Sequence, residues 1–255
     1  MGPGERAVHR FFIPPAWIHG ETVLLGDDVA HQLRHVLRLR PGARITVLDD
    51  RGWEYEVELL TVEHKAARGT ICERRPAGGE PAVQVTLAQA LLKKDNFEWV
   101  LQKGTEIGVT RFVPLITART VAAGEEGVSP ARRERWARIV REAAEQSRRG
   151  ALPVIEAPLS MSAALSLPAD LTLIAWEEER TMSLRQALAP LRGTDAPQVT
   201  IFIGPEGGFT AEEVAQARAG GAVVVTLGAR ILRAETAATA AALLVLYELG
   251  ALDSR

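Results

Sequence analysis

The segment best suited to chemistry is a turn at residues 204–208, Gly-Pro-Glu-Gly-Gly. It follows an apolar run that ends at Ile203, and it precedes Thr210 and Glu213, which have the spacing of a helix-capping box. Glycines let a ligand approach the backbone closely because no Cβ stands in the way. A turn between a buried strand and a helix N-terminus is a common ligand site in α/β proteins. Glu206 disfavours a phosphate here and favours a cationic or hydroxyl-bearing ligand. An ordinary strand-to-helix connection is the alternative.

A second segment rich in charge follows the last apolar run of the chain. Gly228 ends that run, Arg230 and Arg233 come next, and Glu235 with Thr236 opens an alanine-rich helix. Charged side chains between a buried strand and a buried helix are costly unless they are paired or face a cleft. The sequence therefore predicts a cleft at this point, with an Arg233–Glu235 surface pair as the alternative.

Several kinds of site are disfavoured by what the sequence lacks. It contains neither the dinucleotide-binding glycine fingerprint nor a phosphate-binding loop. The motifs that usually indicate binding of a nicotinamide cofactor or a nucleoside triphosphate are therefore missing. All histidines precede residue 65, so chemistry in the later part proceeds without an imidazole. His31 and His35 have the spacing of a metal pair but no evident third ligand, and we expect a basic face there and no metal. The histidines are residues 9, 19, 31, 35 and 64.

The elements that must position these residues are those of an α/β domain. Apolar strands alternate with amphipathic helices, and such continuous apolar strands are typical of a parallel sheet covered on both faces. We predict strands at 83–90, 112–116, 171–176, 199–203 and 223–227. We predict helices at 96–107, 130–148, 184–191, 211–219 and 235–249.

The beginning of the chain has a different pattern. Residues 1–75 contain short alternating segments separated by turn signals, with one predicted helix at 28–39. This pattern predicts a small, mostly β domain, with a barrel as one arrangement of its strands. Residues 76–82 read as a linker, and the α/β domain then occupies 83–255.

Composition narrows the class of protein. Net charge is −2, yet residues 129–150 hold seven arginines and residues 31–44 hold four arginines with no acid. Such clusters are either solvated helix faces or binding sites for a polyanion.

A single cysteine, Cys72, excludes an internal disulfide and fits a small core residue. Residues 1–6 lack the apolar core of a signal peptide, and no apolar run is long enough to span a membrane, so we expect a soluble cytoplasmic protein without membrane contact.

Taken together, the motifs resemble the SPOUT class of methyltransferases, and more closely the bacterial 16S ribosomal RNA (uracil-N3)-methyltransferase family. The resemblance spans nearly the whole chain in the same order, and the last two motifs are the specific ones. The matching segments are 9–12, 31–38, 103–109, 141–148, 204–208 and 227–236.

The resemblance implies a PUA-like N-terminal β domain and a parallel-sheet domain with a C-terminal trefoil knot. It also implies a homodimer that uses S-adenosylmethionine and acts on 16S ribosomal RNA within the assembled small ribosomal subunit. Carried over to this sequence, the cofactor residues are Ala175, Trp176, Gly204, Pro205, Glu206, Gly207, Gly208, Leu227, Gly228, Arg230, Ile231, Leu232 and Thr236.

N3 of uracil bears a proton and becomes nucleophilic only when that proton leaves. Arginine can stabilise the resulting anion through paired hydrogen bonds, and we assign this role to Arg230 or Arg233. Glu206 or Glu235 is the candidate base or orienting group, with water as a further alternative. Phosphates would be bound by arginines of the first domain and of the arginine-rich helix that follows Ser129, namely Arg10, Arg34, Arg38, Arg132 and Arg133.

Rival functions remain open at this point. The first is a SPOUT enzyme that modifies ribose 2′-oxygens or transfer RNA. The others are an inactive RNA-binding assembly factor, which would not bind S-adenosylmethionine, and a small-molecule enzyme with a nucleotide cofactor, which the missing phosphate-binding motifs disfavour.

Overall fold

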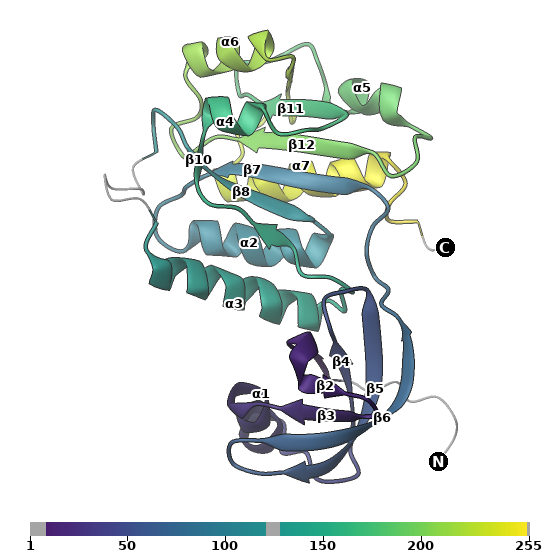
Figure 1. The fold of residues 1–255 in the computed structure, drawn as a ribbon. Helices are drawn as coiled ribbons and strands as arrows, with labels where there is room; N and C mark the ends of the chain where they lie inside the picture. The colour runs from purple at the N-terminus through teal and green to yellow at the C-terminus, as the bar shows by residue number, and fades with distance from the viewer. Residues whose placement is uncertain (1–8, 121–127, 254–255) are drawn as a thin grey trace. The chain divides into compact units, whose positions relative to one another are not determined.

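The computed structural model describes residues 9–120 and 128–253, and the chain forms two compact units (Figure 1). The N-terminal unit comprises residues 1–80 with 144–152, and the C-terminal unit comprises 81–143 with 153–255. Residues 1–6, on which the expectation about a signal peptide rests, lie outside the described residues. In the part of the chain that is described, no helix combines the length and apolarity needed to span a membrane.

The N-terminal unit is built on a six-stranded sheet in the order β1-β4-β5-β6-β3-β2, in which only the β1–β4 pair is parallel. Register shifts in the long β5–β6 hairpin bend the strands, and the sheet curls around its apolar face. That face buries Val23, Ile45, Val47 and Val57 completely. The strands are β1 Arg10–Phe12, β2 Ile18–His19, β3 Thr22–Leu25, β4 Arg44–Leu48, β5 Trp53–Val62 and β6 Ala67–Pro76.

The helix predicted at 28–39 is shorter than expected and changes type midway. A short 3-10 turn, η1 (Pro15–Trp17), precedes it, and α1 (Asp27–His31) then runs directly into a π-helical turn, η2 (Gln32–Val36). The wider turn is closed by the Leu37 amide donating to the Gln32 carbonyl. It keeps Leu33 fully buried in the sheet's core. Arg38 then ends the segment in the left-handed region, with φ 55°.

A distant stretch of the chain, residues 144–152, completes the N-terminal unit. The Glu145 carboxylate accepts a hydrogen bond from the Phe12 amide at 2.9 Å, and the Leu152 amide donates to Asp50 at the same distance. Arg149 is only 3% exposed and forms an ion pair with Glu80. The sequence pattern gave no indication of this association.

The C-terminal unit has a seven-stranded sheet in the order β10-β8-β7-β12-β11-β13, with β9 also paired to β8, and every pair is parallel. The predicted parallel α/β sheet is therefore confirmed. The short strands β9 and β10 were not predicted. The strands are β7 Gln84–Ala90, β8 Arg111–Ile116, β9 Val154–Ile155, β10 Leu159–Ser160, β11 Leu171–Ala175, β12 Gln198–Ile203 and β13 Val223–Val225.

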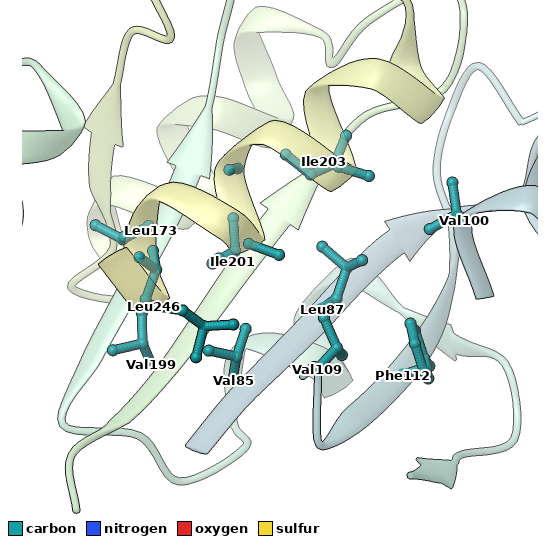
Figure 2. Close-up of a cluster of buried hydrophobic side chains, with 14 of the residues drawn as sticks. Val85, Leu87, Val100, Val109, Phe112, Leu173, Val199, Ile201, Ile203 and Leu246 are labelled. Atoms are coloured by element: carbon teal, nitrogen blue, oxygen red, sulfur yellow. The ribbon is translucent and has the colours of Figure 1, made fainter. Parts of the chain in front are cut away.

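Apolar side chains alternate between the two faces of this sheet, so both faces are buried. Figure 2 shows Val85 and Leu87 of β7 with Val199 and Ile201 of β12 on one face, beside Leu246 of α7. The opposite face carries a second apolar cluster that includes Phe202 of β12. Such double-sided burial is what the near-continuous apolar runs predicted.

Helices cover both faces. The first cluster packs with α2, α3, α5 and α7, and the second with α4 and α6. Thr210 and Glu213 form the predicted capping box. The helix predicted at 184–191 is α-helical only as far as Leu188 and ends in a 3-10 turn that contains Pro190. The helices are α2 Asn96–Ile107, α3 Pro130–Gln146, α4 Met161–Leu165, α5 Leu184–Leu188, η3 Ala189–Leu191, α6 Ala211–Ala219 and α7 Ala234–Glu248.

Candidate active site at the carboxyl ends of three strands

Three adjacent strands of the C-terminal unit, β12, β11 and β13, run in the same direction, so their carboxyl ends lie at one edge of the sheet. The loops that leave these ends enclose a cavity of about 560 Å³. Its lining is Asn96, residues 175–177, Arg180, residues 203–209, residues 226–235 and Ala237. Parallel sheets commonly bind ligands in such a position.

The 204–208 turn forms a wall of the cavity from main chain. The Gly208 amide donates to the Pro205 carbonyl at 2.9 Å, and Gly208 has φ 69°, a conformation that favours glycine. A Cβ on Gly208 would also run into the carboxylate of Glu177. Gly204 is buried, and a Cβ there would lie 3.2 Å from the backbone of Gly208 and Phe209. The glycines are therefore required by the close approach of neighbouring groups.

Side chains and main chain from two other strand ends hold this turn in place. The Lys93 amide donates to the Glu206 carboxylate at 2.9 Å, and Arg119 donates to the Gly207 carbonyl. Gln89, which is 1% exposed, donates its side-chain amide to the Gly204 carbonyl at 3.2 Å. Sequence reasoning missed all of these supports. Gln89 lies near the end of β7, while Lys93 and Arg119 follow β7 and β8. The carboxyl ends of these strands lie at the same sheet edge, so only the strand order could have indicated the supports.

The 226–233 segment supplies cationic groups. Thr226 fixes its start, because its hydroxyl accepts the Gly228 amide at 3.1 Å. Arg230 and Arg233 are exposed and line the cavity. Neither forms an ion pair with a residue in the described part of the chain, so the alternative of an Arg233–Glu235 surface pair is wrong there. The sequence argument for a cleft at this point agrees with the cavity.

A third arginine, which the sequence analysis did not select, also lines the cavity. Arg180 is exposed, and among the described residues its guanidinium has no ion-pair partner. The turn that carries it is organised by Glu179, whose carboxylate accepts the Thr181 hydroxyl and the amides of Arg180, Thr181 and Met182. The hydrogen bonds from Thr181 and these amides lower the pKa of Glu179 to about 2. An ionised carboxylate thus fixes the turn that presents Arg180.

The structure brings most predicted site residues together. Arg230, Arg233, Glu206 and Glu235 all line the cavity, and so does every predicted cofactor residue except Thr236, which is exposed nearby in α7. Helix α7 begins here without a side-chain cap on its N-terminus. Residues that line the cavity but were not predicted are Asn96, Glu177, Arg180, Ile203, Phe209, Thr226, Ala229, Ala234 and Ala237.

The predicted phosphate-binding arginines differ in their surroundings. Arg10 is paired with Glu54 at 2.7 Å, and its side chain is 11% exposed, which makes it a structural residue of the N-terminal unit. Arg34, Arg38 and Arg133 are exposed. Arg132 of α3 lies over the Trp136 ring, 5.2 Å from its centre. Within the described ranges, no three histidine, cysteine or carboxylate side chains converge as a metal site.

Comparison with known proteins agrees with this arrangement. Two family models match the chain, an RNA methyltransferase domain over residues 79–246 and an RNA methyltransferase PUA domain over residues 25–72. The ribosomal RNA small subunit methyltransferase E of Synechocystis is 37% identical over 91% of this chain and 75% of its own length. The Bacillus subtilis protein of the same name is 33% identical over 84% of this chain and 85% of its own.

Solved structures give the same result. The ribosomal RNA small subunit methyltransferase E of Neisseria gonorrhoeae bound to S-adenosylmethionine has a TM-score of 0.82 and 33% identity, covering 94% of this chain and 97% of that one. A methyltransferase from Legionella pneumophila in complex with the same cofactor has a TM-score of 0.85 and 28% identity, covering 95% and 98%. The predicted family and its PUA-like first domain are confirmed. The chain belongs to the ribosomal RNA small subunit methyltransferase E family of RNA methyltransferases.

Proposed function

We propose that this protein transfers a methyl group from S-adenosylmethionine to N3 of a uridine in 16S ribosomal RNA, with the assembled small subunit as substrate. The observation that carries the proposal is the cavity at the β11, β12 and β13 ends. Main-chain atoms of 204–208 and arginines without acidic partners in the described chain surround it. Family membership supports the reaction class, and the small-subunit methyltransferase names of the relatives support the substrate.

The residues around the cavity fit S-adenosylmethionine chemically. Apolar groups such as Ile203, Leu227 and Leu232 suit an adenine ring, and glycine main chain can bind its polar edge. The carboxylates of Glu177 and Glu206 complement a sulfonium cation. When bound there, the cofactor supplies the methyl carbon that the uracil nitrogen attacks. The predicted cofactor residues, including Thr236, remain our assignment for this binding.

The chain's own contribution to the reaction is charge stabilisation and proton transfer. Arg233 or Arg230 would bind O2 or O4 of uracil and stabilise the anion that forms when N3 loses its proton. We favour Glu235 over Glu206 as the group that accepts this proton. One oxygen of Glu206 already accepts the Lys93 amide, so that carboxylate is engaged in holding its turn. Glu235 has no such partner among the described residues. Holding both reactants in line supplies much of the acceleration.

Substrate binding in this proposal uses both compact units. Residues 1–75 would act as an RNA-binding domain, joined through 76–82 to a methyltransferase domain at 83–255. Arg34, Arg38, Arg132 and Arg133 are accessible for phosphates, whereas Arg10 is already paired. Affinity for RNA should then fall steeply with salt concentration. A flat salt response would argue against these phosphate contacts.

We further propose a homodimer that includes α7 in its interface. This helix buries Ala238, Ala242 and Val245, yet it also exposes large apolar side chains, Leu243 at 42% and Tyr247 at 62%. A helix that is apolar on all sides is typical of one buried by a partner. Tyr247→Glu should yield a monomer in sedimentation, and a dimer that survives it would exclude this interface. We also propose that the C-terminal unit forms a trefoil knot around the cavity and that the protein is cytoplasmic.

The decisive experiment is methyl transfer from labelled S-adenosylmethionine to small ribosomal subunits that lack the modification, with nucleoside analysis of the product. Label in 3-methyluridine is the expected result. Label in a ribose 2′-O-methyl nucleoside, or transfer only to transfer RNA, would overturn the proposed target. Cofactor binding absent altogether would favour an inactive assembly factor instead.

A further inference from the structure

A group of three imidazoles lies on the N-terminal unit. The His31 and His35 ring centres are 4.8 Å apart with planes inclined by 32°, and His64 lies edge-on to His35 at 5.9 Å. All three side chains are exposed. His31 ends α1, His35 lies in η2, and His64 comes from the turn between β5 and β6. Two separate parts of the chain therefore bring these rings together; we call them the histidine cluster.

The backbone beneath the cluster has an uncommon conformation. η2 is a π-helical turn, and such turns occur mostly as single insertions in helices, frequently at functional sites. It presents Val36, which is 63% exposed, next to His35. Two residues later Arg38 adopts a left-handed conformation that non-glycine residues rarely adopt. The local sequence is thus folded so that rings and an apolar side chain face outward together.

The charge around the cluster is positive. Residues 29–48 contain no acidic side chain. Arg34, Arg38 and Arg40 are exposed, and in the described ranges none of them has an ion-pair partner. This differs from Arg44, which is paired with Glu56 at 2.7 Å. Among the described residues, no three histidine, cysteine or carboxylate side chains, these imidazoles included, are placed so that they could hold a metal ion together. Aromatic faces surrounded by free guanidinium groups are what proteins use to hold single-stranded nucleic acid.

We propose that the histidine cluster, with Arg34, binds an unpaired nucleotide of the RNA substrate. The base would stack on the imidazole of His35, and Arg34 would bind the adjoining phosphate. A base within a duplex is already stacked on its neighbours, so the site would select a loop, a bulge or an end. This inference rests on the proposed RNA substrate, but it concerns the N-terminal unit and not the methyl-transfer cavity.

A dependence on pH follows from the surroundings of His35. Its pKa lies below the ordinary value because desolvation and the neighbouring His31, Arg34 and His64 disfavour its charged form. A bound phosphate would oppose this effect and raise the pKa, so binding would take up protons. RNA affinity should therefore increase as pH is lowered from about 8 to about 6.

The test measures binding of the full-length protein to a single-stranded oligoribonucleotide and to the same sequence in a duplex. His35→Ala should weaken single-strand binding about tenfold and duplex binding little, since base stacking on an aromatic side chain is worth about 1–3 kcal/mol. His35→Phe keeps a ring and should retain most of the affinity while losing its pH dependence. His19→Ala, at another exposed histidine of the same unit, is the matched control.

The methylation assay separates this inference from the proposed function. If wild-type protein methylates small subunits and His35→Ala raises the KM with unchanged kcat, both stand. Unchanged single-strand affinity in His35→Ala, or a His35→Phe protein as weak as His35→Ala, would overturn the stacking site alone. Failure of the wild-type protein to methylate or bind RNA would instead overturn the proposed function.

Discussion

Arginines in the N-terminal unit and arginines around the cavity are in opposite electrostatic situations. Arg10 and Arg75 both contact the carboxylate of Glu54, which is only 7% exposed. Arg230 and Arg233, in contrast, have no ion-pair partner among residues 9–120 and 128–253. In the first set the guanidinium groups compensate a buried carboxylate, and removing one partner of such a buried pair is strongly destabilising. The second set leaves its hydrogen-bonding capacity available for an anion that arrives from outside.

Replacing an arginine at the cavity should have the largest effect. Arg233→Ala should lower kcat about 100- to 1000-fold, the usual loss when a donor that stabilises a developing anion is removed. Affinity for S-adenosylmethionine should change much less, as isothermal titration would show. Equal losses in kcat and cofactor affinity would contradict the assigned role. Arg185→Ala is a suitable control, since Arg185 is exposed, pairs with Glu248 and lies outside the cavity lining.

Removing a charge from the paired set should instead affect stability. Glu54→Gln leaves Arg10 without its counter-charge and should lower the free energy of unfolding by about 2–3 kcal/mol in urea titrations at neutral pH. The kcat should remain near that of wild type. Glu56→Gln, which alters a pair with the half-exposed Arg44, should cost less than about 1 kcal/mol.

The effect of Glu54→Gln on the free energy of unfolding should depend on pH. Burial tends to raise the pKa of Glu54, but hydrogen bonds from Arg75 and Arg10 outweigh it, and the pKa is lowered in the folded protein. The contribution of Glu54 is therefore present above its ordinary pKa of 4.5 and is lost as pH falls below that value. The stability difference between wild type and Glu54→Gln should shrink in the same range. A difference independent of pH would show that the charge of Glu54 is not its source.

A further prediction tests the main-chain wall of the cavity. Gly208→Val would place a branched side chain at φ 69° and against Glu177, and should weaken S-adenosylmethionine binding about 10- to 100-fold. Gly221→Val is the matched control, because Gly221 also has a positive φ, of 85°, but open space around it and no place in the cavity. If both variants bind the cofactor equally well, the wall does not contact it.

The smallest effect is expected at the turn that presents Arg180. Glu179→Gln keeps the size of the side chain but weakens its acceptance of the three main-chain amides and the Thr181 hydroxyl. We expect a KM for the RNA substrate that is a few-fold higher and a nearly unchanged kcat, in steady-state assays. Glu178→Gln, at the exposed neighbouring position, should leave both constants unchanged.

Much of the C-terminal fold was predictable because its signals are local. Continuous apolar strands, the 204–208 turn and the Thr210 capping box are each written in a few consecutive residues, and the structure confirms the strands and the box. The parts of the cavity lining at 204–208 and 227–235 followed from such segments, whereas Asn96 and Arg180 did not. Glu206 and Arg233 could be selected because a charged residue beside a buried strand needs an explanation.

What could not be predicted depends on contacts between distant parts of the chain. Gln89, Lys93 and Arg119 support the 204–208 turn only because β7 lies between β12 and β8, an order that no single segment reveals. The role of Arg10 was misjudged for the same reason, since its partner Glu54 lies 44 residues away. The π-helical turn at 32–36 was read as ordinary helix because its apolar residues have nearly the same spacing.

The return of residues 144–152 to the N-terminal unit bears on how the chain is made. A ribosome that has released only the first 80 residues has not yet supplied Glu145, the acceptor for the Phe12 amide, or Arg149, the partner of Glu80. The first unit therefore reaches its final contacts only after much of the second has been synthesised. A fragment that ends at residue 80 would lack an integral part of its own structure, so truncation at that point would not isolate the N-terminal unit intact.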